Sequence, residues 1–149
     1  MRHILLDSSP LGLLSSPAPS PQVVAINNWA VACLAAGHFL YIPEVIDYEL
    51  RRELLRAGKA AGLAKLDRLK TQLQYLPITT DSMRRAAELW AQSRRSGRPT
   101  SDPKSLDIDV ILAGQALTLV APPLDVVVAT DNVGHLTRFV AADLWTNLP

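Results

Sequence analysis

Cysteine is nearly absent from the sequence, which has only Cys33, so an intramolecular disulfide and a cysteine-rich zinc site are both excluded. Long apolar runs are absent too, because no stretch approaches the roughly 18 uncharged apolar residues of a membrane-spanning helix. The N-terminal run Ile4–Leu6 ends at Asp7 and is too short for a secretory signal. These absences predict a cytoplasmic protein without a membrane partner.

Aromatic residues are scarce, and several well-known motifs are missing. Aromatic side chains make up 5% of the chain, so base stacking is not an evident mode of binding. There is no GxGxxG, Walker or GxSxG motif, which leaves dinucleotide, nucleoside-triphosphate and serine-hydrolase functions without support. His3, His38 and His135 lack the spacing of metal ligands, and we interpret each of them as structural.

The composition is that of an ordinary globular protein. The chain has 149 residues, of which 48% are hydrophobic and 19% charged. At roughly 100–200 residues per domain, this length predicts a single domain that covers residues 1–149.

The small net charge of +1 conceals a segregation of charge along the chain. Residues 51–104 hold 13 basic and five acidic residues, a local charge of +8, and the two flanking segments together carry −7. A basic block of this kind is typical of a surface that binds a polyanion, although helix solvation alone explains it equally well. The candidate nucleic-acid contacts are Arg51, Arg52, Arg98 and Lys104.

Short apolar runs alternate with amphipathic segments, which predicts an α/β fold with a parallel, doubly wound sheet. We expect strands at 3–6, 39–42, 75–78 and 124–130, a short last strand within 140–146, and helices at 22–36, 44–57, 63–73, 81–95 and 106–119. Thr80 or Asp81 is expected to cap the helix that ends near Arg95. Pro77 indicates an edge strand, and residues 96–103 are typical of a basic loop.

Four acidic residues lie where a solvated surface would not place them. Asp7 and Asp131 directly follow expected strands, Glu49 borders the apolar face of its helix, and Asp109 precedes a long apolar run. Ligands bind beyond the carboxyl ends of the strands in a parallel sheet, so these side chains are expected to converge at one edge. Clustered carboxylates repel one another unless cations neutralise them, and hard oxygen ligands favour Mg²⁺ or Mn²⁺.

Each acid also has a purely structural interpretation. Asp7 suits a turn or a helix cap, Glu49 a solvent-exposed acid, and Asp131 a turn. Asp107 cannot share a helix face with Asp109, which follows two residues later, and we interpret Asp107 as a helix cap or an outer ligand. The convergence of the four acids, more than any one of them, favours metal chemistry.

The same residues match a known family in their order and spacing. The resemblance is to the PIN domain, especially its VapC-like toxin branch, and is carried by the segments Leu5–Ser9, Tyr48–Arg52, Asp109–Ala116 and Val127–Asn132. It covers nearly the whole chain and implies a three-layer α/β/α sandwich with a central, mostly parallel sheet. It also implies a Mg²⁺- or Mn²⁺-dependent ribonuclease, with Asp7, Glu49 and Asp109 as metal-binding acids and Thr130 as the accompanying hydroxyl.

Two positions depart from the pattern of this family. Ser9 stands where many relatives have Asn, and it presents a hydroxyl in place of an amide. The usual pattern Thr-x-Asp or Thr-x-Asn puts Asn132, rather than Asp131, at the fourth position. Either residue is therefore a candidate for the fourth ligand, and the site is expected to hold one or two metal ions.

The leading hypothesis is an endoribonuclease in which a metal-activated water attacks a phosphodiester bond of RNA. The expected catalytic and metal-binding residues are Asp7, Glu49, Asp109 and Asp131, supported by Ser9, Thr130, Asn132 and Asp107. PIN-type toxins dimerise and bind an antitoxin, so the resemblance also implies a homodimer and an antitoxin partner. The alternative is a catalytically weak PIN-like module that binds nucleic acid or protein. A receiver-like phosphoacceptor is disfavoured because no Lys follows an expected strand.

Overall fold

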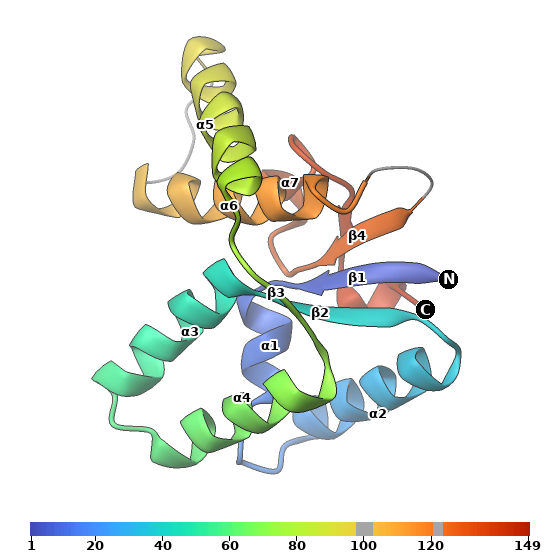
Figure 1. Ribbon diagram of the computed structural model, residues 1–149. Coiled ribbons are helices and arrows are strands. Elements are labelled where there is room, and N and C mark those ends of the chain that lie inside the picture. Colours follow the sequence, from blue (N-terminus) through green and yellow to red (C-terminus); the bar gives the residue numbers. More distant parts are fainter. Residues whose placement is uncertain (98–102, 121–123) are drawn as a thin grey trace.

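The computed structural model describes residues 1–97, 103–120 and 124–149, and the side chains of residues 103–105 lie outside the description (Figure 1). Its strands are β1 (Arg2–Leu6), β2 (Phe39–Pro43), β3 (Gln74–Leu76), β4 (Asp125–Ala129) and β5 (Ala142–Asp143). In these ranges they form one five-stranded sheet of order β3-β2-β1-β4-β5. Every strand pair in this sheet is parallel.

Helices cover both faces of the sheet (Figure 1). On one face lie α1 (Ser8–Leu14), α2 (Pro21–Ala35), α3 (Glu44–Arg56) and α4 (Ala60–Gln72), and on the other α5 (Thr80–Arg95), α6 (Pro103–Leu117) and α7 (Val133–Leu136). A 3₁₀ turn at Trp145–Asn147 follows β5. The α/β/α sandwich with a parallel central sheet is therefore confirmed. Among the described helices, none has the length and apolarity needed to cross a bilayer.

Strand β1 is the centre of the core. It pairs with β2 on one side and with β4 on the other, and Ile4, Leu5 and Leu6 are completely buried. A parallel strand that is covered on both faces needs apolar side chains in consecutive positions, which explains the unbroken run in the sequence. The apolar run ends at Asp7, so this carboxylate lies at the carboxyl edge of the central strand.

The elements that the sequence did not predict are short. Helix α1 has seven residues and contains Pro10 and Gly12, so its local propensity is poor, and it forms because Asp7 caps it and Leu11 and Leu14 pack into the core. Helix α7, with four residues, is too short to give a periodic pattern. Of the two structural interpretations of Asp7, the helix cap is therefore confirmed and the turn is wrong.

Several predicted boundaries also shift. The N-cap of α5 is Thr79, not Thr80 or Asp81, because its side chain accepts a hydrogen bond from the Ser82 amide at 3.1 Å. Helix α6 begins at Pro103, three residues earlier than expected, and the last strand is reduced to Ala142–Asp143. Strand β3 is at the edge of the sheet, as Pro77 indicated. The expected basic loop at residues 96–103 falls largely outside the described residues.

Helix α6 lies between the sheet and α5, and its contact with α5 is unusually close (Figure 1). A side chain at Gly114 would place its Cβ on the Ser82 carbonyl oxygen and 3.2 Å from the Ala86 backbone nitrogen. Both neighbours are backbone atoms of a helix, which cannot move aside as a flexible side chain does. Only glycine therefore permits this approach of α5 to α6.

We expect Gly114→Ala to lower the free energy of unfolding by about 1–3 kcal/mol or more, because the added methyl group forces α5 away from α6. Urea denaturation followed by circular dichroism measures the change. Gly12→Ala is the control, since its Cβ would meet only Leu50 Cδ1 at 3.9 Å, an ordinary contact. Equal stability of Gly114→Ala and the wild type would contradict the packing described here.

Candidate active site

The carboxyl ends of β1 and β4 border a cavity of about 220 Å³. The residues that line it are Asp7, Ser8, Ser9, Glu49, Ile108, Asp109, Thr130, Asp131, Asn132 and His135. All four acids selected from the sequence are among them. Asp7 and Asp131 follow β1 and β4, and Glu49 and Asp109 lie on α3 and α6. They meet because parallel strands end at the same edge of the sheet, where the neighbouring helices also lie.

Asp7 is fixed by hydrogen bonds to both of its carboxylate oxygens. The Ser8 amide donates to Oδ1 at 2.7 Å, and the Thr130 hydroxyl donates to Oδ2 at 2.7 Å. The Thr130 hydroxyl in turn accepts from the Asn132 amide at 2.8 Å, so its direction is set. Asp7 is thus the N-cap of α1 and also lines the cavity, which unites the two interpretations of the sequence.

Burial raises the pKa of Asp7, and the nearby charge of Asp131 raises it further. The hydrogen bonds from Thr130 and Ser8 oppose this effect because they stabilise the ionised form. Burial likewise raises the pKa of Glu49, with a contribution from the negative charge of Asp7. The protein alone therefore opposes full ionisation of these carboxyl groups.

Glu49 is positioned by the anchoring of α3 at its N-terminus. The buried Gln115 of α6 accepts a hydrogen bond from the Val45 amide at 3.2 Å and donates one to the Leu76 carbonyl at 2.7 Å. Glu44 accepts from the Ile78 amide at 2.7 Å. These bonds join α3 to α6 and to the end of β3. They hold the turn of α3 that carries Glu49 toward the cavity.

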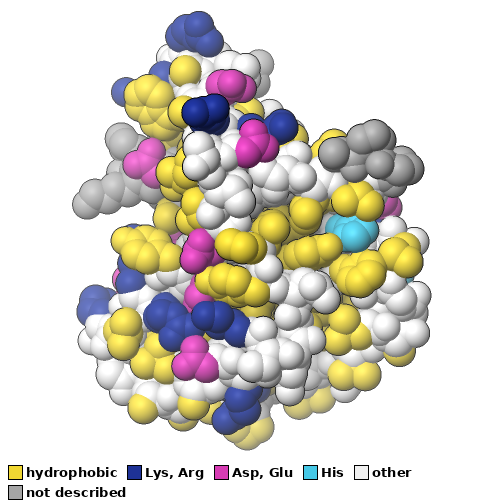
Figure 2. All heavy atoms as spheres, viewed as in Figure 1, with side chains coloured by type: hydrophobic (Ala, Val, Ile, Leu, Met, Phe, Trp, Pro, Cys, Tyr) yellow, Lys and Arg dark blue, Asp and Glu magenta, His cyan; other side chains and the backbone are white. Residues whose placement is uncertain are grey.

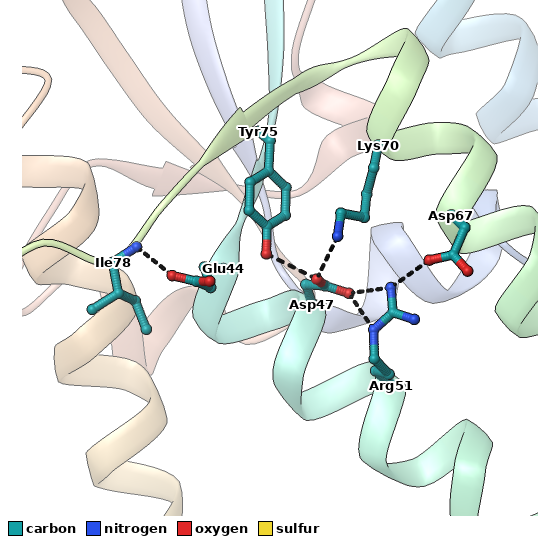
Figure 3. Close-up of polar contacts among 7 residues, drawn as sticks. All are labelled: Glu44, Asp47, Arg51, Asp67, Lys70, Tyr75 and Ile78. Carbon is teal, nitrogen blue, oxygen red and sulfur yellow. Dashed lines mark hydrogen bonds and ion pairs between the residues drawn. The ribbon is translucent and has the colours of Figure 1, made fainter.

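A second set of contacts holds α3 to α4 and β3, and Figure 3 shows it. Asp47, which is 5% exposed, pairs with Arg51 at 3.0 Å and Lys70 at 3.6 Å, and it accepts a hydrogen bond from the Tyr75 hydroxyl at 2.9 Å. Arg51 also pairs with Asp67 at 2.7 Å. Arg51, a candidate phosphate contact in the sequence, is therefore engaged in ion pairs inside this network and is absent from the lining of the cavity.

Asp109 and His135 lie beside each other in the lining of the cavity. Asp109 Oδ2 lies 3.9 Å from His135 Nδ1, and both atoms are buried without a hydrogen-bond partner. Burial raises the pKa of Asp109 to about 6, and the charges of Asp7 and Glu49 add to this shift while His135 opposes it. A buried carboxylate oxygen without a partner is a strained arrangement that a cation would relieve.

Asp131 and Asn132 both line the cavity but are exposed. The Ser9 hydroxyl donates a hydrogen bond to Asp131 Oδ2. Asn132 uses its backbone amide to orient Thr130, and its side chain stays at the rim. Both residues thus remain candidates for the fourth ligand. Ser9 acts here as a neighbour of Asp131.

Asp107 is the supporting residue that the structure places elsewhere. It lies inside α6, four residues after the helix begins, so it is not a helix cap. It is exposed and lines a separate groove with Met83, Trp90 and other residues of α5 and α6. The interpretation of Asp107 as a helix cap was wrong because the helix starts earlier than its apolar run. Its role as an outer ligand stays a prediction.

Three residues with a role in the site were not selected from the sequence. Ser8 follows Asp7, and its amide donates a hydrogen bond to the Asp7 carboxylate. A hydrogen bond from its hydroxyl lowers the pKa of Glu49. Gln115 is a polar residue within an apolar run, a signal that was available in the sequence. His135 carried no signal, because only the fold brings α7 against Asp109.

The other candidate nucleic-acid contacts either do not line the cavity or lie outside the described residues. Arg52 is exposed and its guanidinium lies 5.1 Å from the centre of the Tyr48 ring. Arg98 and the side chain of Lys104 are outside the described residues. On the face drawn in Figure 2, Lys and Arg side chains gather over the far end of α5 and over α3 and α4, with acidic and hydrophobic side chains between them.

The donor set of the cavity fits a hard divalent cation. In the described part of the chain, no group of three or more His, Cys, Asp or Glu side chains is already arranged to hold a metal ion. Mg²⁺, however, keeps several waters and needs only one or two protein carboxylates. The unpartnered Asp109 Oδ2 and the raised pKa values of Asp7, Glu49 and Asp109 are the features that such an ion would relieve.

The sequence matches no protein-family model and no curated protein, and the similarity to known proteins lies in the fold. A chain of VapBC2 from Rickettsia felis, crystallised with a DNA fragment from its promoter, superposes with a TM-score of 0.73 at 16% identity, over 96% of this chain and 98% of that one. DNA-bound VapBC from Salmonella typhimurium gives a TM-score of 0.68 at 19% identity, over 97% and 99% of the two chains. VapBC-1 from nontypeable Haemophilus influenzae gives 0.68 at 16% identity, over 97% and 98%.

The protein is thus an α/β/α sandwich with an acidic cavity at the carboxyl edge of its parallel sheet. Its fold is the PIN-like fold found in VapBC structures, and this likeness extends over nearly the whole chain. The fold that the sequence resemblance implied is therefore confirmed.

In protein free of divalent ions, we expect Asp109→Asn to raise the free energy of unfolding at pH 7 by on the order of 1–2 kcal/mol. The pKa of Asp109 is about 6 in the folded protein and near 3.8 in the unfolded chain. The folded state therefore binds more protons between these values, and its stability falls as the pH rises from about 4 to 6. Ionised Asp109 consequently destabilises the fold at pH 7.

Urea denaturation in EDTA at pH 4.5 and pH 7 tests this expectation. The benefit of Asp109→Asn should be larger at pH 7 than at pH 4.5. Asp107→Asn, on the same helix but exposed and outside the cavity, should change stability little at either pH. An Asp109→Asn variant less stable than the wild type at pH 7 would show that ionisation of this carboxylate does not destabilise the fold.

Proposed function

We propose that the protein is a divalent-metal-dependent endoribonuclease. The observation that carries the proposal is the convergence of Asp7, Glu49 and Asp109 on one cavity of a PIN-like fold, with pKa values raised by burial and mutual repulsion. Carboxylates gathered in this way form a site for Mg²⁺ or Mn²⁺.

Asp7, Glu49 and Asp109 would hold the metal, with Asp131 or Asn132 completing the set at the rim. Bound there, Mg²⁺ or Mn²⁺ would polarise a phosphodiester of RNA and lower the pKa of a water. The Thr130 and Ser8 hydrogen bonds keep both oxygens of Asp7 in a fixed direction. Such preorganisation means that little rearrangement is needed when substrate enters.

Among the described residues, His135 and Arg52 are two groups with positive or donor character near the acids. His135 lines the cavity beside Asp109, and the positive charge of Arg52 lowers the pKa of Glu49. Both side chains are partly or fully exposed and would lie close to a phosphate that enters the cavity. We propose that they contribute to substrate binding, together with the bound cation.

We further propose that the enzyme is the toxin of a toxin–antitoxin pair in the cytoplasm. The likeness to chains of VapBC complexes supports an antitoxin partner. Large hydrophobic side chains on the surface, among them Val31, Leu55, Met83 and Trp90, offer area for that partner and for a homodimer.

The competing function is a catalytically weak PIN-like module that binds nucleic acid or protein. It is favoured by one observation, that within the described ranges no three potential ligands are already arranged around a metal position. The two functions differ in whether the acids are needed for turnover.

Asp7→Asn should reduce RNA cleavage at least about 100-fold, because it removes a negative ligand where charge develops. The fold should survive, since Asn caps a helix as well as Asp does. Cleavage of a fluorophore-labelled RNA in Mn²⁺, together with circular dichroism melting, measures both effects. Asp107→Asn should keep full activity, and wild-type activity in Asp7→Asn would exclude the proposed mechanism.

Millimolar Mn²⁺ should raise the Tm of the wild type by about 3 °C or more, because a cation that binds only the folded state stabilises it. The shift should be lost in Asp109→Asn and kept in Asp107→Asn. Differential scanning calorimetry at pH 7 gives the measurement without any substrate. Equal shifts in the two variants would mean that the acids do not bind the ion.

A further inference from the structure

A second cavity, of about 300 Å³, adjoins the acidic one. It is lined by Ser9, Leu13, Gln22, Asp131, Leu144, Trp145 and Thr146. Ser9 and Asp131 line both cavities, and their side chains are hydrogen-bonded to each other. This pair is therefore the partition between the two, and a ligand held in the acidic cavity extends naturally across it into the second.

The indole of Trp145 gives this cavity a firm aromatic wall. Its ring packs at 5.6 Å and an angle of 59° against Trp29, whose Nε1 donates to the Leu148 carbonyl at 3.2 Å. The 3₁₀ turn that carries Trp145 is itself tied to Asp143, which accepts from the Leu144 amide at 2.8 Å and from Asn147 Nδ2 at 3.0 Å. The ring is thus held in place before any ligand arrives.

The remaining lining combines apolar and neutral polar side chains. Leu13 and Leu144 add apolar surface beside the indole, and the exposed Gln22 and Thr146 bring an amide and a hydroxyl. Among the described residues of this lining, Asp131 at the shared partition is the one that carries a charge. Such a lining disfavours a phosphate or an acidic peptide. It suits a flat, neutral ring with hydrogen-bonding edges.

We propose that the second cavity is a base-recognition subsite, which takes the nucleobase next to the phosphate held in the acidic cavity. Proteins recognise single-stranded RNA by stacking a base on an aromatic ring and bonding its edge to side chains. An amide such as that of Gln22 can donate and accept at once, which matches a base that presents a donor beside an acceptor. The assignment to an RNA substrate rests on the proposed nuclease function.

The low aromatic content of the chain gave no sign of base stacking, because a composition does not show where the aromatic residues lie. One anchored ring beside the acidic cavity is enough to stack one base. Trp145 therefore lets the enzyme prefer one base next to the cleaved bond. Contacts to phosphate do not distinguish one base from another.

Titration with the four neutral ribonucleosides, followed by NMR of the indole N–H signals, tests the subsite without metal, phosphate or turnover. At least one nucleoside should shift the Trp145 signal and leave that of Trp90 on α5 unmoved. Trp145→Phe identifies the signal and retains an aromatic ring. Gln22→Ala should weaken the binding at least about threefold, and Asn28→Ala, an exposed amide further along α2, should not change it.

Cleavage of an RNA library with one randomised position then separates this proposal from the nuclease proposal. The wild type should prefer one base beside the cleaved bond, and Trp145→Leu should reduce that preference by roughly fivefold or more. If Trp145→Leu does not fold, Gln22→Ala provides the same comparison. Nucleoside shifts without any RNA cleavage would refute the nuclease and leave base binding in place.

Two results would overturn the subsite. One is the absence of any nucleoside-induced shift at Trp145, whether or not RNA is cleaved. The other is cleavage with an unchanged base preference in both Gln22→Ala and Trp145→Leu. A protein partner that buries Trp145 while nucleosides leave its signal unmoved would instead identify the cavity as a protein contact.

Discussion

The burial of neighbouring carboxylates at one edge of a parallel sheet is the constraint around which this protein is built. Asp7, Glu49 and Asp109 each have a raised pKa, and burial is the main cause in all three. Such a cluster persists only on a scaffold whose apolar burial outweighs its cost. The fully buried strand β1, paired on both sides, supplies the centre of that scaffold and ends at Asp7.

The supports of the cluster are buried polar contacts, which specify position more than they add stability. Gln115 joins α6 to α3 and β3, and Asp47 joins α3 to α4 and β3 (Figure 3). Both fix the helix that carries Glu49. The glycine at 114 lets α5 approach α6, so that Asp109 is carried on a helix packed between α5 and the sheet. The helices that carry Glu49 and Asp109 are therefore held in place by contacts with neighbouring elements.

The basic block and the acidic flanking segments of the sequence have different roles in the structure. Arg51 neutralises Asp47 and Asp67, Arg85 pairs with Asp81, and Arg56 pairs with Glu53. Part of the basic block is therefore engaged in local ion pairs. On the face in Figure 2, the Lys and Arg side chains of the described residues form separate groups with acidic and hydrophobic side chains between them. Four acids of the flanking segments, in contrast, gather around the cavity: Asp7 and Asp131 follow strands that end at this edge, and Glu49 and Asp109 lie on the helices that meet there. Strand-end and helix positions thus located the acidic site in the sequence, whereas the charge count did not locate a basic one.

The sequence by itself determined the order of most strands and helices, the parallel sheet and the strand-end positions of Asp7 and Asp131, because apolar periodicity and strand ends are local properties. It did not predict α1 or α7, whose short segments form only where capping and packing favour them. Only the tertiary structure decided that Asp107 lies apart, that Arg51 is internally paired, and that His135 and Trp145 come to the site. Those outcomes depend on contacts between residues far apart in the chain, which no local pattern records.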